Sequence, residues 1–385
     1  MHVRGASLLV VVWLLGAMAP AASISVSPPG LSGAPDVVAP GIELYRMDGT
    51  APGDVPSPQS IRLLRLEPSR VRLESSLATG EIPGRATVQA IARRSGALAA
   101  VNAGFFSPAG DPTGVLRIDG RLVSDTQRAR GAVALLDSPD GVQALFDHVR
   151  ARVRLRFRAR DKWQTVPVDA IDGVRGARRL VLFSPASGPT TDTTGGLEWA
   201  LTGSPLRVTR VSETGNSGIP AGGYVLSYGG TSVPPVLAAL RDASSIEVRE
   251  TLDVRSGSRL RDWIRAPTLV GGAGLLLRDG QALSEWQVER LSKGFDTTRH
   301  PRTVIARDRR GAIWLIVIDG RQPGRALGMT FAEMQALLTQ LDVVDALNLD
   351  GGGSTTMVVR GELVNRPSDV VGPRAVSDAL VVHAR

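Results

Sequence analysis

The sequence contains no cysteine, which excludes a disulfide framework, a zinc site with thiolate ligands and a lipid-modified amino-terminal cysteine. Aromatic residues make up 4% of the chain and histidines number 4, so the stacking platforms and histidine clusters of many binding proteins are not evident. Hydrophobic residues, however, make up 43% of the 385 residues. That length suits one large domain or two ordinary ones, and stability must come from a hydrophobic core.

Lysine is almost missing, because Lys162 and Lys293 are the only two in a chain with 45 cationic residues and a net charge of +8. The arginines that supply the charge look scattered among acidic residues rather than gathered in a stripe. We therefore expect no nucleic-acid partner, and favour anionic polymers of the cell envelope as the partners of this charge.

The amino-terminal segment has the pattern of a secretory signal. A basic start precedes an apolar run from Leu8 to Leu15 and a small-residue stretch around Ala21, so residues 1–22 are interpreted as a signal peptide. The run is shorter than the roughly 20 residues that span a bilayer, and an uncleaved anchor is the alternative. No second such run follows. The sequence thus predicts an exported bacterial protein, periplasmic or extracellular, with unknown oligomeric state.

Residues 23–58 are rich in Pro, Gly, Ser and Ala and predict a flexible arm or linker outside the core. Beyond them, residues 59–385 predict one β-rich α+β domain of mixed sheets with a few packing helices, in which 150–262 is a candidate lobe framing substrate entry. Alternation of polar and apolar residues over 60–76 predicts a hairpin.

Two segments have the same order of features: Thr87 to Phe106 and Thr330 to Ser354 each predict an amphipathic helix, a short apolar strand and a glycine loop. Hairpins with a charged residue and Gly in the turn begin at Val115, Leu275 and Met357. A degenerate internal duplication would explain this and would bring two glycine loops to one cleft. The other explanation is that such hairpins are common.

The strongest local signal is the stretch ALNLDGGGSTTMVV, residues 346–359. Gly351, Gly352 and Gly353 let the backbone turn sharply, and their N–H groups with the hydroxyls of Ser354 and Thr355 could bind an anion. Asp350 would supply a carboxylate that activates water, attacks an anomeric carbon or stabilises developing positive charge. A tight turn capped by the aspartate is the structural alternative. No Lys follows the glycines, so the stretch is not a nucleotide-binding P-loop.

Together with companion motifs, this stretch resembles the phosphodiester glycosidase domain family over about Ala90 to the carboxyl terminus. The motifs are AVNAGFF at 100–106, RHPRTVIA at 299–306, VIDGR at 317–321, NLDGGGSTTMV at 348–358, and PSD with RAVSDALVV between 367 and 382. Asp378 departs from the family, which usually has an amide there. The resemblance implies hydrolysis between an anomeric carbon and a phosphate oxygen. Arg302 and Arg374 are the candidates to bind phosphate with a guanidinium fork.

Further candidates complete the predicted site. Asn102 could bind a sugar hydroxyl or orient a carboxylate, and Thr303 is similarly placed. Asp319, at the end of the apolar strand IWLIVID, is the candidate second catalytic carboxylate, although an ordinary Asp-Gly turn explains it too. Asp296 and Glu289 are reserves. We expect no metal or other cofactor, since no metal-binding motif is present, with a divalent ion between Asp350 and Asp319 as the alternative.

The reaction expected from these residues is hydrolysis of a sugar phosphodiester, drawn from an envelope or exopolysaccharide glycan. Two other functions stay open. The protein could bind phosphate-containing glycans without turnover, or it could be a phosphodiesterase that breaks the P–O bond.

Overall fold

The computed structural model describes residues 31, 33–50, 58–126, 128–284 and 286–385. The interpretation of residues 1–22 as a signal peptide lies outside them. The described chain is rich in antiparallel strands with few helices, which confirms the β-rich α+β class. Within these residues no helix is long and apolar enough to cross a membrane.

The largest sheet of the described chain carries most of the site. Its strands run in the order β1 (Asp36–Ala39), β2 (Ile42–Thr50), β3 (Pro58–Leu66), β21 (Ile313–Ile318), β20 (Arg302–Asp308), β22 (Val343–Asn348), β18 (Leu275–Arg278) and β19 (Gln281–Ala282). A smaller sheet packs against it, in the order β24 (Glu362–Leu363), β23 (Met357–Val359), β5 (Ala99–Asn102), β25 (Asp378–Ala384) and β4 (Val71–Leu77).

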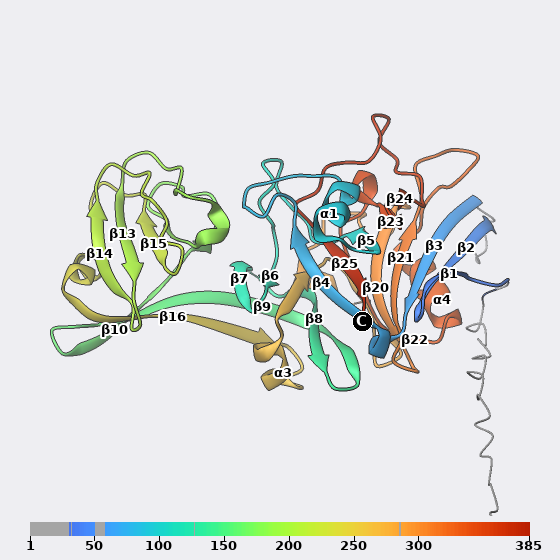
Figure 1. Ribbon diagram of the computed structural model, residues 1–385, viewed down its shortest axis with the longest axis horizontal. Helices are drawn as coiled ribbons and strands as arrows, with labels where there is room; N and C mark the ends of the chain where they lie inside the picture. The colour runs from blue at the N-terminus through green and yellow to red at the C-terminus, as the bar shows by residue number, and fades with distance from the viewer. Residues whose placement is uncertain (1–30, 32, 51–57, 127, 285) are drawn as a thin grey trace, which may run out of the picture.

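A third sheet leads away from this pair. It runs in the order β10 (Lys162–Pro167), β9 (Gly141–Ala159), β8 (Arg130–Ser138), β17 (Thr268–Gly271), β6 (Leu116–Ile118) and β7 (Arg121–Ser124), while β16 (Ala243–Val254) also pairs with β9. The fourth sheet consists of β11 (Ala170–Ile171), β12 (Leu180–Phe183), β15 (Tyr224–Tyr228), β13 (Leu197–Thr202) and β14 (Arg207–Ser212). In Figure 1 this fourth sheet lies at the far end of the long strands β9 and β16, away from β20 to β22.

Few helices accompany the sheets. In the described chain, the α-helices are α1 (Val88–Ser95), α2 (Pro235–Ala238), α3 (Leu260–Arg265) and α4 (Phe331–Gln340). Short 3₁₀ turns are η1 (Pro68–Arg70), η2 (Pro185–Ser187), η3 (Ala239–Asp242), η4 (Trp286–Glu289) and η5 (Gly352–Ser354).

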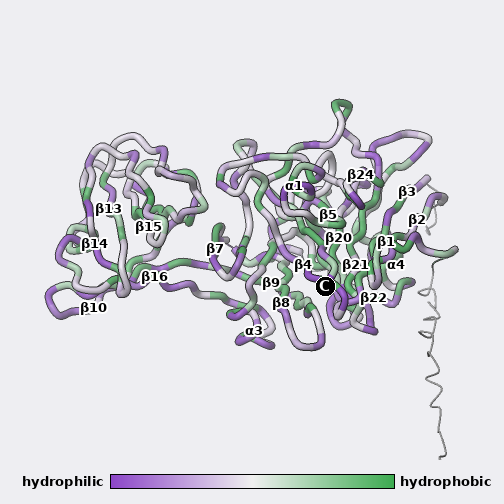
Figure 2. Tube along the Cα trace, viewed as in Figure 1, coloured by the Kyte–Doolittle hydropathy of each residue, from purple (hydrophilic) through white to green (hydrophobic). Residues whose placement is uncertain are grey.

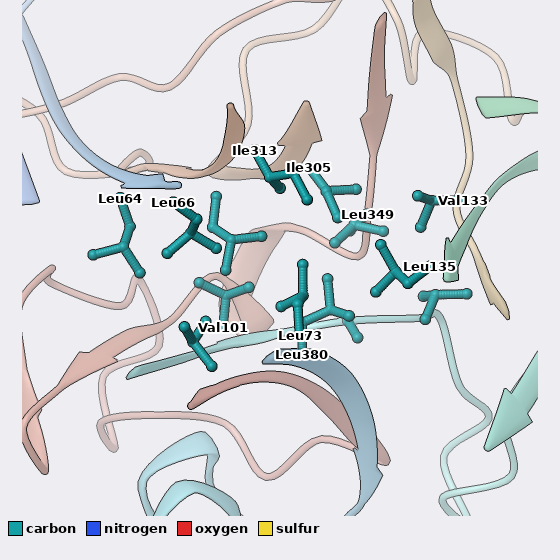
Figure 3. Packing of buried hydrophobic residues seen from close by; sticks show 14 of the residues in the cluster. Leu64, Leu66, Leu73, Val101, Val133, Leu135, Ile305, Ile313, Leu349 and Leu380 are labelled. Carbon is teal, nitrogen blue, oxygen red and sulfur yellow. The ribbon is translucent and has the colours of Figure 1, made fainter. Parts of the chain in front are cut away.

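The central strands are buried on both faces. Leu64 and Ile305 of the largest sheet pack on Val101 and Leu380 of the smaller one in a shared core (Figure 3). On the other face, α4 packs through a second hydrophobic cluster. This double burial explains why β21 is a continuous apolar run and why the middle of β20 is apolar. Figure 2 shows hydrophobic segments gathered there.

Two predictions about the amino-terminal half are wrong. Residues 36–50 are not part of an arm: β2 pairs with β3 along its whole length, and Ile42 and Leu44 are buried in the core. The stretch 60–76 is not a hairpin either, because β3 pairs with β2 and β21 whereas β4 pairs with β25 in another sheet. The Pro68 turn therefore carries the chain from one sheet to the other.

The paired helix, strand and loop segments are confirmed. Thr87 caps α1 by accepting a hydrogen bond from Ala90, and Thr330 forms a capping box with Glu333 at the start of α4. Each helix leads into a strand, β5 or β22, and the hairpins β6–β7, β18–β19 and β23–β24 form as expected.

Candidate active site

Antiparallel pairing brings the ends of three strands to one place. β20 pairs with β21 so that Arg302 lies opposite Ile318, and with β22 so that Val304 lies opposite Asn348. The chain that follows β22 therefore emerges beside the start of β20. A pocket of about 200 Å³ lies here, lined by Phe105, Phe295, His300, Pro301, Arg302, Arg321, Asp350, Gly351, Gly352 and Arg374.

Asn102, at the end of β5, forms hydrogen bonds with the glycine loop that follows β22. Its side-chain nitrogen donates to the backbone oxygen of Asp350 at 2.6 Å, and its side-chain oxygen accepts from the Thr303 hydroxyl at 2.7 Å and the Thr356 N–H at 3.1 Å. The Asp350 N–H in turn donates to the carbonyl of Ala103 at 3.0 Å. Asn102 is 1% exposed, so it orients the aspartate rather than a sugar.

Asp350 is the one carboxyl group among the residues that line this pocket. Burial raises its pKa to about 6, against the opposing effects of the Ser354 hydroxyl, the Gly351 N–H and Arg374, while the nearby Asp378 carboxylate adds to the rise. One carboxylate oxygen accepts from the Gly351 N–H at 2.9 Å. A carboxyl with this pKa is mostly ionised at neutral pH and is suited to accept a proton.

Arg302 lies at the pocket with most of its donors already used. Its Nε donates to Met329 O at 3.0 Å, and one terminal nitrogen, Nη2, donates to Phe295 O at 2.7 Å and Thr298 O at 2.9 Å. The guanidinium also lies over the rings of Phe295 and Phe331. Burial lowers the pKa of Arg302 to about 10, so it stays charged. None of these three bonds uses its second terminal nitrogen, Nη1.

Arg321 is a pocket cation that the sequence reasoning did not single out. Its Nη2 lies 3.2 Å from Nδ1 of His300, and its guanidinium lies where a side chain on Gly352 would be, within 3.1 Å of an ideal Cβ. Burial, Arg302 and Arg321 lower the pKa of His300, so the ring is neutral at pH 7 and accepts this hydrogen bond at Nδ1. The VIDGR motif contains this arginine and is the signal in the sequence that could have predicted it.

Arg374 reaches the pocket from the loop before β25. It makes a bidentate ion pair with Asp369, with distances of 2.9 and 3.1 Å, and its side chain is 43% exposed. A Cβ on Gly353 would lie 2.2 Å from both Arg374 Nη2 and an Asp369 oxygen. The third glycine is therefore required by this ion pair.

The glycine loop does not form the expected cradle of free N–H groups. The Gly351 N–H donates to the Asp350 carboxylate, that of Gly352 to Pro301 O, and those of Ser354 and Thr355 to the carbonyls of Gly351 and Gly352. The loop closes into the turn η5, which consumes these donors. Positive charge at this pocket comes from arginine side chains instead.

The predicted hydroxyl contacts are also buried. Thr303 is 0% exposed and donates to Asn102, while Ser354 and Thr355 are 0% and 1% exposed. None of the three lines the pocket. These hydroxyls are therefore buried in the protein and not presented to the pocket.

Asp319 does not line the pocket, so the prediction of it as the second catalytic carboxylate is not supported. Its oxygens accept from the side chain of Asn365 at 2.9 Å and from the N–H of Arg366 at 3.0 and 3.1 Å. Asn365 in turn binds Thr355 O and the Met357 N–H. Asp319 thus positions the strand that follows the glycine loop.

Asp378 is the carboxylate that acts electrostatically on Asp350. It is 1% exposed and accepts hydrogen bonds from Ser377, at 2.8 Å, and from the Gly104 N–H, at 3.3 Å. Burial raises its own pKa, in spite of these donors and that of Ser75. Asp378 therefore places a second carboxyl group next to the site.

The remaining candidates fall away from the pocket. Glu289 is 0% exposed and binds His148 and two backbone N–H groups. Asp296 lies near enough to raise the pKa of Arg302 but does not line the pocket. Residues 150–262 contribute no lining residue.

No group of three or more His, Cys, Asp or Glu side chains suited to a metal ion occurs among the described residues. Asp350 lines the pocket, whereas Asp319 does not. Both Asp319 carboxylate oxygens accept hydrogen bonds from the protein. A divalent ion held between these two carboxylates therefore has no support from their placement.

Comparisons with known proteins find similarity to one family of enzymes. Residues 196–383 match the phosphodiester glycosidase family, a range that contains Arg302, Arg321, Asp350 and Arg374. The mouse N-acetylglucosamine-1-phosphodiester alpha-N-acetylglucosaminidase is 36% identical over 123 residues, which are 30% of this chain and 23% of the mouse protein. The chain thus spans less than a quarter of that relative's length.

Solved structures share the fold. A hypothetical protein from Synechocystis superposes with a TM-score of 0.73 at 25% identity, covering 90% of this chain and 62% of that one. A protein from Burkholderia pseudomallei described as a putative exported protein superposes with a TM-score of 0.68 at 24% identity, covering 84% of this chain and 74% of its own. These findings show that residues 196–383 are similar to the phosphodiester glycosidase family, and that the chain shares its wider fold with the two solved structures.

Proposed function

We propose that the protein is a hydrolase that cleaves the bond between an anomeric carbon and a phosphate oxygen in a sugar phosphodiester. The observation that carries this proposal is that Asp350 and the arginines 302, 321 and 374 line one pocket of about 200 Å³. One basic carboxylate beside several cations is what a sugar attached to an anionic leaving group requires.

Asp350 acts on the water. Its pKa of about 6 leaves the carboxylate ionised at neutral pH, and Asn102 fixes its backbone through the 2.6 Å bond to Asp350 O. The carboxylate accepts a proton from water while the water oxygen bonds to the anomeric carbon. The bond from that carbon to the phosphate oxygen breaks, and its electron pair leaves with the phosphate. The products are the free sugar and a phosphomonoester.

The arginines act on the leaving group. Arg321 has its guanidinium at the pocket with His300 as its partner, Arg302 offers its remaining terminal nitrogen, and Arg374 adds charge beside Asp350. Phosphate leaves as a stable anion, so the reaction needs no strong general acid. This accounts for a pocket that is lined by one carboxylate and several guanidinium groups.

We propose further that the protein is exported and acts on a phosphate-containing glycan of the envelope or an exopolysaccharide. The amino-terminal sequence supports export, and so does the fold shared with a protein described as putatively exported. The excess of positive charge supports a polyanionic substrate.

The test compares Asp350→Asn with Asp161→Asn, a matched loss of one carboxylate at a side chain 93% exposed. Both proteins are assayed for sugar and phosphomonoester released from a sugar-1-phosphodiester. We expect kcat to fall at least about 100-fold for Asp350→Asn, the usual range for a proton-transfer residue, and to stay unchanged for Asp161→Asn. Unchanged turnover in folded Asp350→Asn protein would remove this residue from the mechanism. A wild type that binds the substrate without releasing product would favour a binding protein.

A further inference from the structure

Five arginines alternate along β9, at positions 150, 152, 154, 156 and 158. The apolar residues that alternate with them, from Val149 to Phe157, are buried. Successive side chains of a strand point to opposite faces. The arginines therefore share one face, with neighbours about 6.5 Å apart. The scattered distribution expected from the sequence is wrong here.

The neighbouring strands extend this face. Antiparallel pairing places Arg249 of β16 opposite Arg154 and Trp163 of β10 opposite Arg158. Trp163 is 43% exposed, and the Arg156 guanidinium lies 3.8 Å from the centre of its ring. We call the six arginines and Trp163 the arginine face.

Acidic residues neutralise only part of the arginine face. Glu247 pairs with Arg156 and Arg249, and Asp253 pairs with Arg152. Asp161, in the turn after β9, pairs with Arg158. Within the described chain Arg150 and Arg154 make no ion pair, and the Nε groups of Arg150 and Arg152 are buried without a hydrogen-bond partner.

The opposite face of β9 is buried in a hydrophobic core. Val153, Leu155 and Phe157 pack with Trp199 and Leu226 of the fourth sheet in one hydrophobic cluster. The arginine face is therefore the open side of a sheet whose other side is core. It is a fixed array of cations, and none of its residues lines the catalytic pocket.

We propose that the arginine face binds a linear polyanionic glycan, the polymeric form of the substrate, at a site separate from the pocket. Regularly spaced guanidinium groups bind phosphates along a polymer, and the exposed tryptophan stacks on a sugar ring. The choice of a glycan rests on the proposed function, whereas the charge of the face does not.

A glycan fits the arginine face better than a single-stranded nucleic acid does. Proteins that bind single strands stack successive bases on several aromatic side chains. In the described chain Trp163 is the one aromatic among the exposed large hydrophobic side chains. A single exposed aromatic side chain beside many cations suits a polymer that carries regularly spaced phosphates and needs few stacking contacts.

The test measures binding of the full chain to a soluble sugar-phosphate polymer of the teichoic type, in an Asp350→Asn background that prevents turnover. The variant Arg154→Gln/Arg158→Gln removes two charges from the arginine face. Its matched control is Arg207→Gln/Arg210→Gln, two exposed arginines of β14 on the fourth sheet. Trp163→Ala tests stacking. Neutral dextran, poly(dT) and phosphatidylglycerol vesicles serve as competing ligands.

We expect polymer affinity to fall about tenfold in Arg154→Gln/Arg158→Gln at low salt and less than twofold in the control pair. Raising the salt concentration from 50 to 200 mM lowers affinity about threefold for each phosphate contact. The variant makes two contacts fewer than its parent. Its loss of affinity over this range should therefore be about tenfold smaller than that of the parent. Trp163→Ala should weaken binding of the polymer several-fold.

Equal polymer affinity of the arginine-face variant and the control pair would overturn the proposal, as would failure of the parent to bind. Tighter binding of poly(dT) or of the vesicles than of the glycan would overturn the choice of occupant. The pocket is tested separately: with Asp350 intact, Arg154→Gln/Arg158→Gln should cleave a small sugar phosphodiester at the wild-type rate. No cleavage by the wild type, combined with polymer binding at the arginine face, would reject the proposed function alone.

Discussion

Replacing Asp350 with Asn should stabilise the folded protein while it abolishes turnover. Burial raises the pKa of this carboxyl from 3.8 to about 6, so ionising it costs more in the folded than in the unfolded chain. A difference of about two pH units corresponds to at most about 3 kcal/mol. Asn keeps an oxygen for the Gly351 N–H and removes the charge.

The sign of the pH dependence follows from the raised pKa. The stability that the wild type derives from the protonated carboxyl is fully present below about pH 4, and it is lost as the pH rises through 6. Asp350→Asn does not suffer this loss. Its advantage in the free energy of unfolding should therefore be near zero at pH 4 and grow to its maximum by pH 7 to 8.

Urea unfolding at several pH values from 4 to 8 measures this difference. Asp161→Asn is again the control for loss of one carboxylate, at a side chain 93% exposed. A constant or negative effect of Asp350→Asn over the whole range would refute the reasoning, since it would show that no buried charge is relieved. Gain of stability with loss of activity is the usual signature of a functional residue in a costly environment.

Three further variants test the surroundings of Asp350. Asn102→Ala should lower the free energy of unfolding by about 3 kcal/mol, because buried groups including the Thr356 N–H lose their partner, as urea unfolding would measure. Asp378→Asn should shift the acid limb of the kcat/KM profile to lower pH, since the repulsion that helps raise the pKa of Asp350 disappears; an unshifted limb would contradict the coupling. Arg321→Gln should lower kcat on a sugar phosphodiester about 10-fold to 100-fold, and an effect on KM alone would show ground-state binding instead.

Features encoded locally were predictable from the sequence. Threonine caps, apolar strands and Asp-Gly turns act over a few residues, so the helix, strand and loop order around Asn102 and Asp350 could be predicted before the structure. The contact between the two loops could be expected because both follow buried strands.

Features that depend on pairing between distant strands were not predictable. Asp319 and Asp378 both belong to plausible motifs, yet pairing of β25 with β5 places Asp378 next to Gly104, while Asp319 ends among Asn365 and Arg366. Gly351 to Gly353 predicted an anion-binding backbone, but neighbouring carbonyls and a carboxylate take several of those donors. The strands at 36–50 were hidden by the turn-rich composition around them.

Hydrolysis of a sugar-1-phosphodiester in oxygen-18 water tests the central claim most directly. If Asp350 directs water to the anomeric carbon while the arginines hold the departing phosphate, the heavy oxygen must appear in the released sugar. Heavy oxygen in the phosphomonoester would mean that the P–O bond breaks, which would contradict the account.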